Sequence, residues 1–145
     1  MAEAMRQADL GRAAGEVPVG AVLVSAAGEL LAVAHNEPVR LHDPTAHAEV
    51  LAMRGAGRRL GNYRLDGCVL VVTLEPCAMC AAAAVHARLA GVVFGAADPR
   101  AGAVLSCMDG LELPFLNHHV WHMGGVASED CARQLRDFFL SMRGG

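Results

Sequence analysis

The sequence predicts an α/β fold in which one mixed or parallel sheet carries helices on both faces. Two continuous apolar runs, CVLVVTL (68–74) and GVVFGA (91–96), are short and rich in β-branched residues, as strands buried on both faces are. Segments with helical character alternate with such runs, which is typical of a layered α/β domain. A chain of 145 residues is long enough for a sizeable core, so we expect one domain over residues 1–145.

The first half of the chain predicts a helix, a β-hairpin and a second helix. Residues 2–14 have an amphipathic pattern that a glycine ends. The apolar runs at 19–25 and 30–36 are separated by AAGE, which indicates a hairpin. The polar segment 37–45 contains two prolines, so we expect a loop there. The sequence AHAEVLAMRGAG after it predicts a helix that extends to about Gly57.

The second half predicts three strands and two helices. After the strand at 68–74, the alanine-rich segment 78–88 is expected to be helical, and the next buried strand is 91–96. The segment HHVWHM (118–123) is the candidate for a fifth strand. The last helix is expected from about 128 to 142, with a serine as its N-terminal cap.

Composition and charge exclude several classes of protein. The chain is 54% hydrophobic and 19% charged, which is typical of a globular protein. No apolar run reaches the ~18 residues of a membrane span, and the N-terminus lacks a signal-peptide core, so we expect a cytoplasmic protein with no membrane partner. The net charge of −3 provides no overall attraction to nucleic acid. Five cysteines in such a chain favour metal binding or catalysis over disulfides.

The segment TLEPCAMC (73–80) places two cysteines three positions apart, where a strand ends and a helix begins. Pro76 restricts the residue before it to extended backbone and suits the first turn of a helix, so we expect Cys77 and Cys80 in that turn. The spacing puts both sulfurs on one helical face, and the helix dipole favours the thiolate that binds metal. Two such thiolates form half of a zinc site, although a CxxC motif alone also suits redox chemistry.

The missing ligand is expected to be a histidine, and among seven histidines His47 stands out. It belongs to HDPTAHAE (42–49), in which Pro44 interrupts a loop and a helix begins close to His47. On a regular helix, positions 47 and 49 point about 200° apart, so His47 and Glu49 are not expected to bind the metal together. Three protein ligands with a free fourth position are typical of catalytic zinc, whereas structural zinc normally has four.

Glu49 then has a chemical role beside the metal. Two thiolates neutralise the charge of the zinc ion, which makes it a weaker acid toward its water than a zinc held by three histidines. A neighbouring carboxylate can take the proton of the water and return it to a leaving group. The set therefore predicts a hydrolytic site that suits attack on an electrophilic carbon and release of a group such as ammonia.

Together, the segments His47-Ala48-Glu49 and Pro76-Cys77-Ala78-Met79-Cys80 form the H-x-E…P-C-x-x-C signature of zinc nucleoside and nucleobase deaminases. Over nearly its whole length the chain resembles the bacterial tRNA-specific adenosine deaminases. The matching stretches are VPVGAVLV (17–24), HDPTAHAE, NYRL (62–65), TLEPCAMC, VVFGA with Asp98, and DFF (137–139). The resemblance implies a three-layer α/β/α cytidine deaminase-like fold with a five-stranded mixed sheet, a homodimer, one Zn²⁺ per chain, and hydrolytic conversion of the wobble adenosine of a tRNA anticodon to inosine.

Residue by residue, the resemblance assigns the metal to His47, Cys77 and Cys80 and proton transfer to Glu49. It also implies contacts with the anticodon loop of the tRNA. These substrate-binding candidates are Asn36 for the flipped base, Asp98 for a ribose, and Asn117 and His118 for the mouth of the site.

Two observations qualify these RNA contacts. Judged from residue type alone, Asn36 and Asn117 suit the capping of turns or strand ends equally well. Ala97 stands where some relatives carry an arginine, and the terminal SMRGG lacks the basic tail of some members. We therefore expect few contacts between the protein and RNA phosphates.

Three alternatives remain open. A deaminase of free guanine is the nearest, because DPTAHAE also resembles that family, although the segments 86–88 and FGA–Asp98 argue against it. A cytosine or cytidine deaminase is more distant. A zinc-stabilised binding module without catalysis would need a fourth ligand, such as His42 or His86, and would leave Glu49 without a role.

Overall fold

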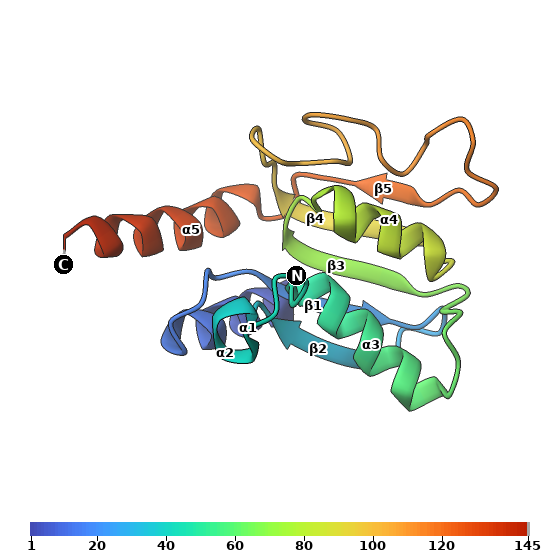
Figure 1. The fold of residues 1–145 in the computed structure, drawn as a ribbon, viewed down its shortest axis with the longest axis horizontal. Coiled ribbons are helices and arrows are strands. Elements are labelled where there is room, and N and C mark those ends of the chain that lie inside the picture. The colour runs from blue at the N-terminus through green and yellow to red at the C-terminus, as the bar shows by residue number, and fades with distance from the viewer. Residues whose placement is uncertain (145) are drawn as a thin grey trace.

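A five-stranded mixed sheet forms the centre of the computed structural model, which describes residues 1–144 (Figure 1). The strand order is β2-β1-β3-β4-β5; β1 is antiparallel to β2 and β3, whereas β3, β4 and β5 are parallel. This arrangement confirms the predicted α/β class and all predicted strands. The strands are β1 (Gly20–Val24), β2 (Leu30–His35), β3 (Val69–Leu74), β4 (Gly91–Ala96) and β5 (Trp121–Met123).

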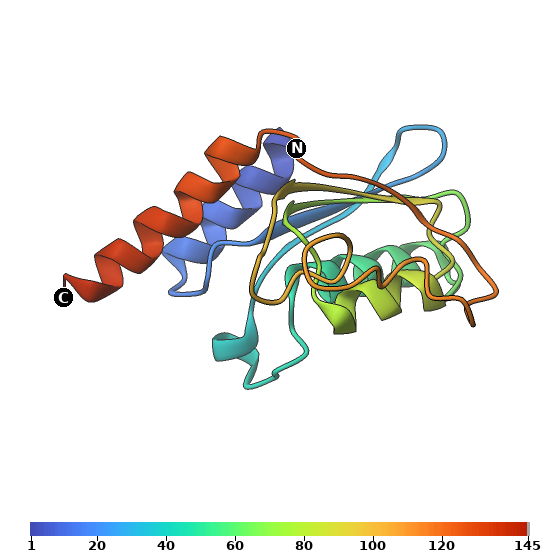
Figure 2. The ribbon, with the colours of Figure 1, turned by 90° about the horizontal axis from the view of Figure 1, so that it is seen from above.

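Helices cover both faces of the sheet. Figure 2 shows α1 and α5 on one face and α3 and α4 on the other, which confirms the three-layer α/β/α arrangement. The helices are α1 (Ala2–Ala13), α2 (Pro38–Leu41), α3 (Ala48–Leu60), α4 (Ala78–His86) and α5 (Ser128–Arg143). The short helix α2 lies in the segment that we expected to be a loop, so the expectation was wrong at these positions.

The continuous apolar strands supply the centre of the hydrophobic core. β3 lies between β1 and β4 in the sheet, and helices cover it from both sides. The side chains of Leu23, Leu70, Val72 and Val92 are fully buried, with 0% of their surface exposed. A strand of this kind cannot alternate polar and apolar residues, because neither of its faces meets water.

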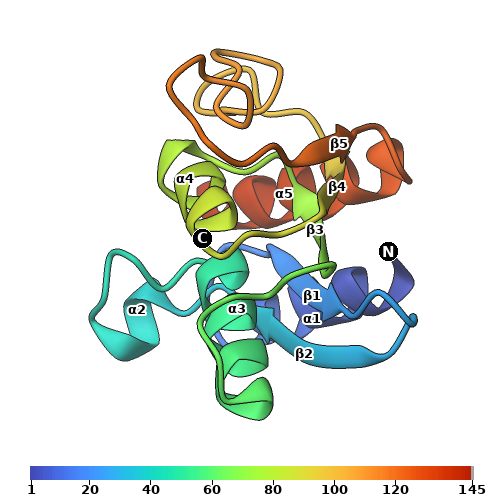
Figure 3. The ribbon, with the colours of Figure 1, turned by 90° about the vertical axis from the view of Figure 1, so that its right-hand side faces the viewer.

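A long connection from residue 97 to residue 120 joins β4 to β5. Figure 3 shows it folded together at one end of the molecule, beyond α4. It contains no helix or strand, but Ala103, Val104 and Leu111 on it are buried in the core. Within residues 1–144, no helix has the length and the apolar character required to cross a membrane.

Candidate active site and metal centre

The two segments of the signature meet because α3 and α4 lie side by side and begin at the same end of the sheet (Figure 1). His47 directly precedes α3 and Cys77 directly precedes α4; both have extended backbone, with ψ angles of 150° and 177°. Cys80 is the third residue of α4. Cys77 thus lies one position before the turn in which we expected it, but both sulfurs remain at the start of the helix.

The ring of His47 points its Nδ1 atom at the two sulfurs. The distances from this atom are 3.7 Å to Cys77 Sγ and 3.5 Å to Cys80 Sγ. Zinc bonds of about 2.3 Å to sulfur and about 2.05 Å to nitrogen, at a tetrahedral angle, would separate such atoms by about 3.6 Å. All three donor atoms lie within 4.8 Å of one another. The donor set and its spacing therefore fit a zinc ion.

Hydrogen bonding shifts the pKa values of the two thiols in opposite directions. Hydrogen bonds from Cys80 and His47 lower the pKa of Cys77 to about 3. The same bond to Cys77, together with burial, raises the pKa of Cys80. The bond to Cys77 also raises the pKa of His47. A metal ion needs the imidazole neutral and both sulfurs as thiolates, so binding here should release protons.

Glu49 lies in the first turn of α3, and only 4% of its surface is exposed. Burial raises the pKa of its carboxyl group. Glu49 does not belong to the cluster of three ligand atoms found among the described residues. A buried carboxyl with a raised pKa, beside a metal site but not part of it, suits the transfer of protons.

Asn36, directly after β2, is tied to the start of α3. Its side-chain Oδ1 accepts a hydrogen bond from the backbone N–H of Ala48, 2.8 Å away. This N–H belongs to the first turn, where helical N–H groups have no partner within the helix. Asn36 thus caps the start of α3. This contact places its side chain at Ala48, the residue between His47 and Glu49.

Asp98, two residues after the end of β4, closes a turn. Its Oδ1 accepts hydrogen bonds from the N–H groups of Arg100 at 3.0 Å and Ala101 at 3.2 Å. The N–H of Asp98 itself donates to Glu75 Oε1 at 3.1 Å. Because Glu75 is two residues before Cys77, the structure places Asp98 close in the fold to the metal-binding segment.

Asn117 and His118 lie at the opposite end of α4. Asn117 Oδ1 accepts a hydrogen bond from Arg88 at 3.3 Å, and His118 Nε2 donates to the carbonyl of Leu89 at 2.7 Å. Both partners follow the C-terminal end of α4, a helix of nine residues, whereas Cys77 precedes its start. Such a helix is about 13 Å long. The structure therefore does not bring these two residues to the metal group.

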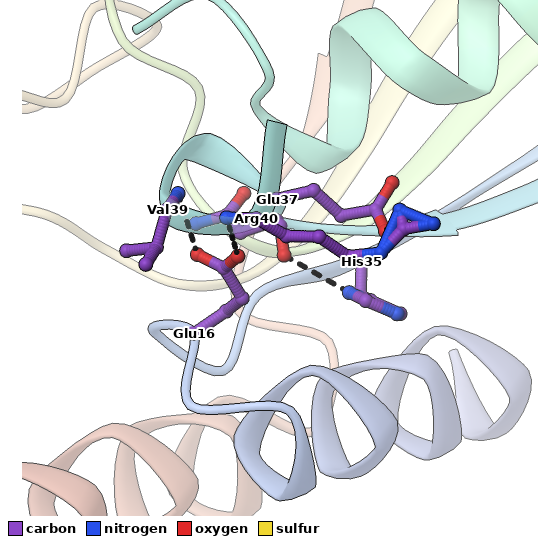
Figure 4. Close-up of polar contacts among 6 residues, drawn as sticks. Glu16, His35, Glu37, Val39 and Arg40 are labelled. Atoms are coloured by element: carbon purple, nitrogen blue, oxygen red, sulfur yellow. Dashed lines mark hydrogen bonds and ion pairs between the residues drawn. The ribbon is translucent and has the colours of Figure 1, made fainter. Parts of the chain in front are cut away.

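Two buried carboxylates have roles that the sequence analysis missed. Glu16, 2% exposed, accepts hydrogen bonds from the N–H groups of Val39 at 3.1 Å and Arg40 at 2.9 Å, at the start of α2 (Figure 4). Glu75 is also 2% exposed. Burial opposes the charge of Glu75, but hydrogen bonds from Ser106 and its neighbours outweigh burial and lower the pKa of Glu75 to about 2. An acidic residue inside an apolar run is the only signal that could have indicated them.

A fourth protein ligand is not present among the described residues. The metal-binding group contains His47, Cys77 and Cys80, and neither His42 nor His86 belongs to it. His86 lines a groove between α3 and α4 instead. Three ligands beside a buried carboxyl are typical of a catalytic zinc site rather than a closed structural one.

Comparison with known proteins agrees with this geometry. Residues 1–96 match the model of the cytidine and deoxycytidylate deaminase zinc-binding region. The tRNA-specific adenosine deaminase of Haemophilus influenzae is 42% identical over 99% of this chain and 83% of its own length. A structure from a study of A-to-I editing by tRNA:A34 deaminases at the wobble position superimposes with a TM-score of 0.90 at 41% identity, covering 93% of this chain and 97% of that chain.

A guanine deaminase is less similar. The structure of the enzyme from Bacillus subtilis matches with a TM-score of 0.64 at 31% identity, covering 99% of this chain and 91% of that chain. The zinc-binding region of the family identifies zinc as the metal of this fold. The chain thus belongs to the cytidine and deoxycytidylate deaminase family and, within it, to the zinc-dependent deaminases that include the tRNA-specific adenosine deaminases.

Proposed function

We propose that the protein deaminates adenosine to inosine at the wobble position of a tRNA anticodon. The observation that carries this proposal is the group of His47, Cys77 and Cys80 beside the buried, non-ligating Glu49. The family supplies the reaction class, because its members deaminate cytidine and deoxycytidylate. The full-length relatives supply the substrate, because they are tRNA-specific adenosine deaminases at 42–45% identity.

In the proposed mechanism, His47 Nδ1 and the sulfurs of Cys77 and Cys80 hold the zinc ion. When bound, zinc lowers the pKa of a water molecule and so supplies the nucleophile. Glu49 accepts a proton from this water and delivers it to the departing amino group. A C6–O bond forms, the C6–N bond breaks, and ammonia leaves. The raised pKa of Glu49 suits both halves of this transfer.

The substrate base has to leave its stack to reach such a site, at a cost of a few kcal/mol. Asn36 is our candidate for holding the extruded base. Its Oδ1 is used by Ala48, so its Nδ2 amide is the group left to donate a hydrogen bond. An adenine ring nitrogen accepts such a bond.

A groove beside α5 is our candidate for the RNA backbone. It has a volume of about 600 Å³ and contains Asp98, three arginines and the half-exposed ring of Phe139. The arginines are Arg100, Arg136 and Arg143, and none forms an ion pair with an acidic side chain within residues 1–144. Arginine suits phosphate, and an exposed aromatic ring suits a stacked base. These cations offset the alanine at position 97.

We also propose a homodimer that forms through the groove between α3 and α4. This groove, of about 770 Å³, is lined by apolar side chains that include Val50, Met53 and Leu65. On α4 the lining residues Ala83 and His86 belong to the last turn, so a second copy packed here would cover the end of α4 that lies away from the metal-binding cysteines. We also propose a cytoplasmic location, because the proposed substrate is a tRNA.

The test is to incubate purified protein with an anticodon stem-loop and, separately, with free guanine. Inosine in the RNA supports the proposal, whereas xanthine from guanine would support the guanine deaminase alternative. Glu49→Ala is the control: it should keep its zinc and bind RNA, while deamination falls by a factor of roughly 10² to 10⁴. Loss of zinc from this variant would mean that Glu49 is a ligand and would contradict the mechanism.

A further inference from the structure

Glu75 forms a hub between the metal-binding segment and the connection from β4 to β5. Its Oε1 accepts hydrogen bonds from the N–H of Asp98 at 3.1 Å and from the hydroxyl of Ser106. Its Oε2 accepts from the N–H groups of Val104 at 3.1 Å, Leu105 at 2.9 Å and Ser106 at 2.9 Å. One buried side chain thus holds a turn of the connection through its backbone.

The connection is shaped around this carboxylate. A Cβ atom on Gly102 would lie 2.4 Å and 2.5 Å from the two carboxylate oxygens, which is much closer than van der Waals contact, so only glycine fits there without a shift. The N–H of Ala103 donates to the carbonyl of Pro76 at 2.8 Å. The Glu75 side chain and the Pro76 carbonyl therefore both hold this turn of the connection. The metal ligand candidate Cys77 directly follows Pro76 in the chain.

The chemistry of the hub explains why it is a carboxylate. Four N–H groups and one hydroxyl converge on Glu75, and no arginine forms an ion pair with it within residues 1–144. Only an ionised carboxylate can accept at both oxygens without bringing a donor of its own. A glutamine of the same shape would set its amide group against backbone N–H groups.

We propose that Glu75 is a positioning residue for the substrate. It sets the place of Asp98, and of the arginine-lined groove beside α5, relative to the metal ligand Cys77. The inference rests on the proposed function, because Asp98 matters here only if it contacts the nucleotide next to the edited base. Glu75 itself touches neither metal nor base.

A double-mutant cycle tests the link between Glu75 and Asp98. We would measure kcat and KM on an anticodon stem-loop for the wild type, Glu75→Gln, Asp98→Ala and the double variant. Each single change should raise KM about tenfold with a smaller effect on kcat, and the double variant should be no worse than the worse single one. The zinc content should remain that of the wild type. Multiplied effects, about a hundredfold in KM, would overturn the proposal.

Glu16→Gln is the matched control, since it alters a second buried carboxylate that holds backbone N–H groups, but in the loop that contains α2. Its effect on KM should multiply with that of Asp98→Ala. If Glu16→Gln instead showed the same coupling to Asp98, the cycle would report general loosening of the fold, and the proposal would fail.

Two milder variants keep the test decisive if Glu75→Gln does not fold. Ser106→Ala removes one hydroxyl donor, and Gly102→Ala pushes a methyl group against the carboxylate. Both should raise KM and lose this effect in the Asp98→Ala background; additive effects would refute the inference. A wild type that deaminates no RNA would contradict the proposed function itself, whereas an active wild type with an additive cycle contradicts only the role of Glu75.

Discussion

The side-chain oxygen of Asn36 accepts a hydrogen bond from the backbone N–H of Ala48, 2.8 Å away. Ala48 separates the metal ligand candidate His47 from the proton carrier candidate Glu49. A residue at the end of β2 therefore fixes the start of α3, on which both functions depend. The capping role and the proposed substrate role of Asn36 use different atoms of one amide, so they do not compete.

This division of one amide leads to the first prediction. Asn36→Asp keeps an acceptor for the N–H of Ala48 but removes the amide donor, so stability should be kept while deamination falls at least tenfold. Asn36→Ala removes both groups and should also cost about 1 kcal/mol in the free energy of unfolding. Thermal unfolding and inosine formation measure the two effects. Equal activity of Asn36→Asp and the wild type would remove Asn36 from the substrate site.

The metal centre is the subject of the second prediction. The wild type should hold one zinc per chain, and Cys80→Ala should lose most of it, because a buried thiolate ligand is missing. Cys131→Ala, which changes a buried cysteine outside the metal group, is the control and should keep its zinc. Metal analysis of the purified proteins decides the point. Full retention of zinc in Cys80→Ala would exclude this residue from the ligand set.

Much of the fold could be predicted because its strands have a strong local pattern. β3 and β4 are short, continuous apolar runs that contain β-branched residues, a pattern typical of strands that are covered on both faces. The helix α2 has four residues, too few for a helical period in the sequence. It forms where Glu16, from a distant segment, supplies acceptors for the N–H groups of Val39 and Arg40. Such a contact leaves no local signal.

The candidate site divides in the same way. His47, Cys77 and Cys80 could be predicted because each metal ligand has a characteristic residue type and spacing. Glu75 could not, because four of its five hydrogen-bond donors are backbone N–H groups, which every residue but proline carries. Asn117 and His118 were assigned by resemblance alone, and the structure places them beyond the far end of α4.

The third prediction concerns the loop that leads to His47. Asp43 Oδ1 accepts hydrogen bonds from the hydroxyl of Thr45 at 2.7 Å and from its N–H at 2.8 Å, and these bonds lower the pKa of Asp43 below its ordinary value of 3.8. A carboxyl whose pKa is lower in the folded state stabilises the fold above its unfolded pKa and loses this effect as the pH falls through the folded value.

Asp43→Asn should therefore have a lower Tm than the wild type at pH 6, and the gap should close as the pH falls below about 4. Thr45→Val removes the hydroxyl donor but keeps the backbone donor. The difference in Tm between this variant and the wild type should therefore depend less on pH than the difference for Asp43→Asn. Thermal unfolding across a pH series measures both. A gap that stays constant over the whole series would show that the charge of Asp43 does not contribute.

The last prediction concerns how the protein holds RNA despite a net charge of −3. Arg100, Arg136 and Arg143 line one groove beside α5, so a bound single strand should meet about three cations there. Each phosphate that a cation neutralises contributes about −0.7 to the slope of log affinity against log salt on a single strand, which predicts a slope near −2 for a stem-loop bound by its loop.

Arg136→Ala should make the slope shallower by about 0.7. Arg6→Ala, which removes an arginine paired with Glu3 on α1, should leave the slope unchanged. Equal slopes for Arg136→Ala and the wild type would mean that the RNA follows another path, and a wild-type slope much steeper than −4 would mean that arginines outside this groove also bind phosphate.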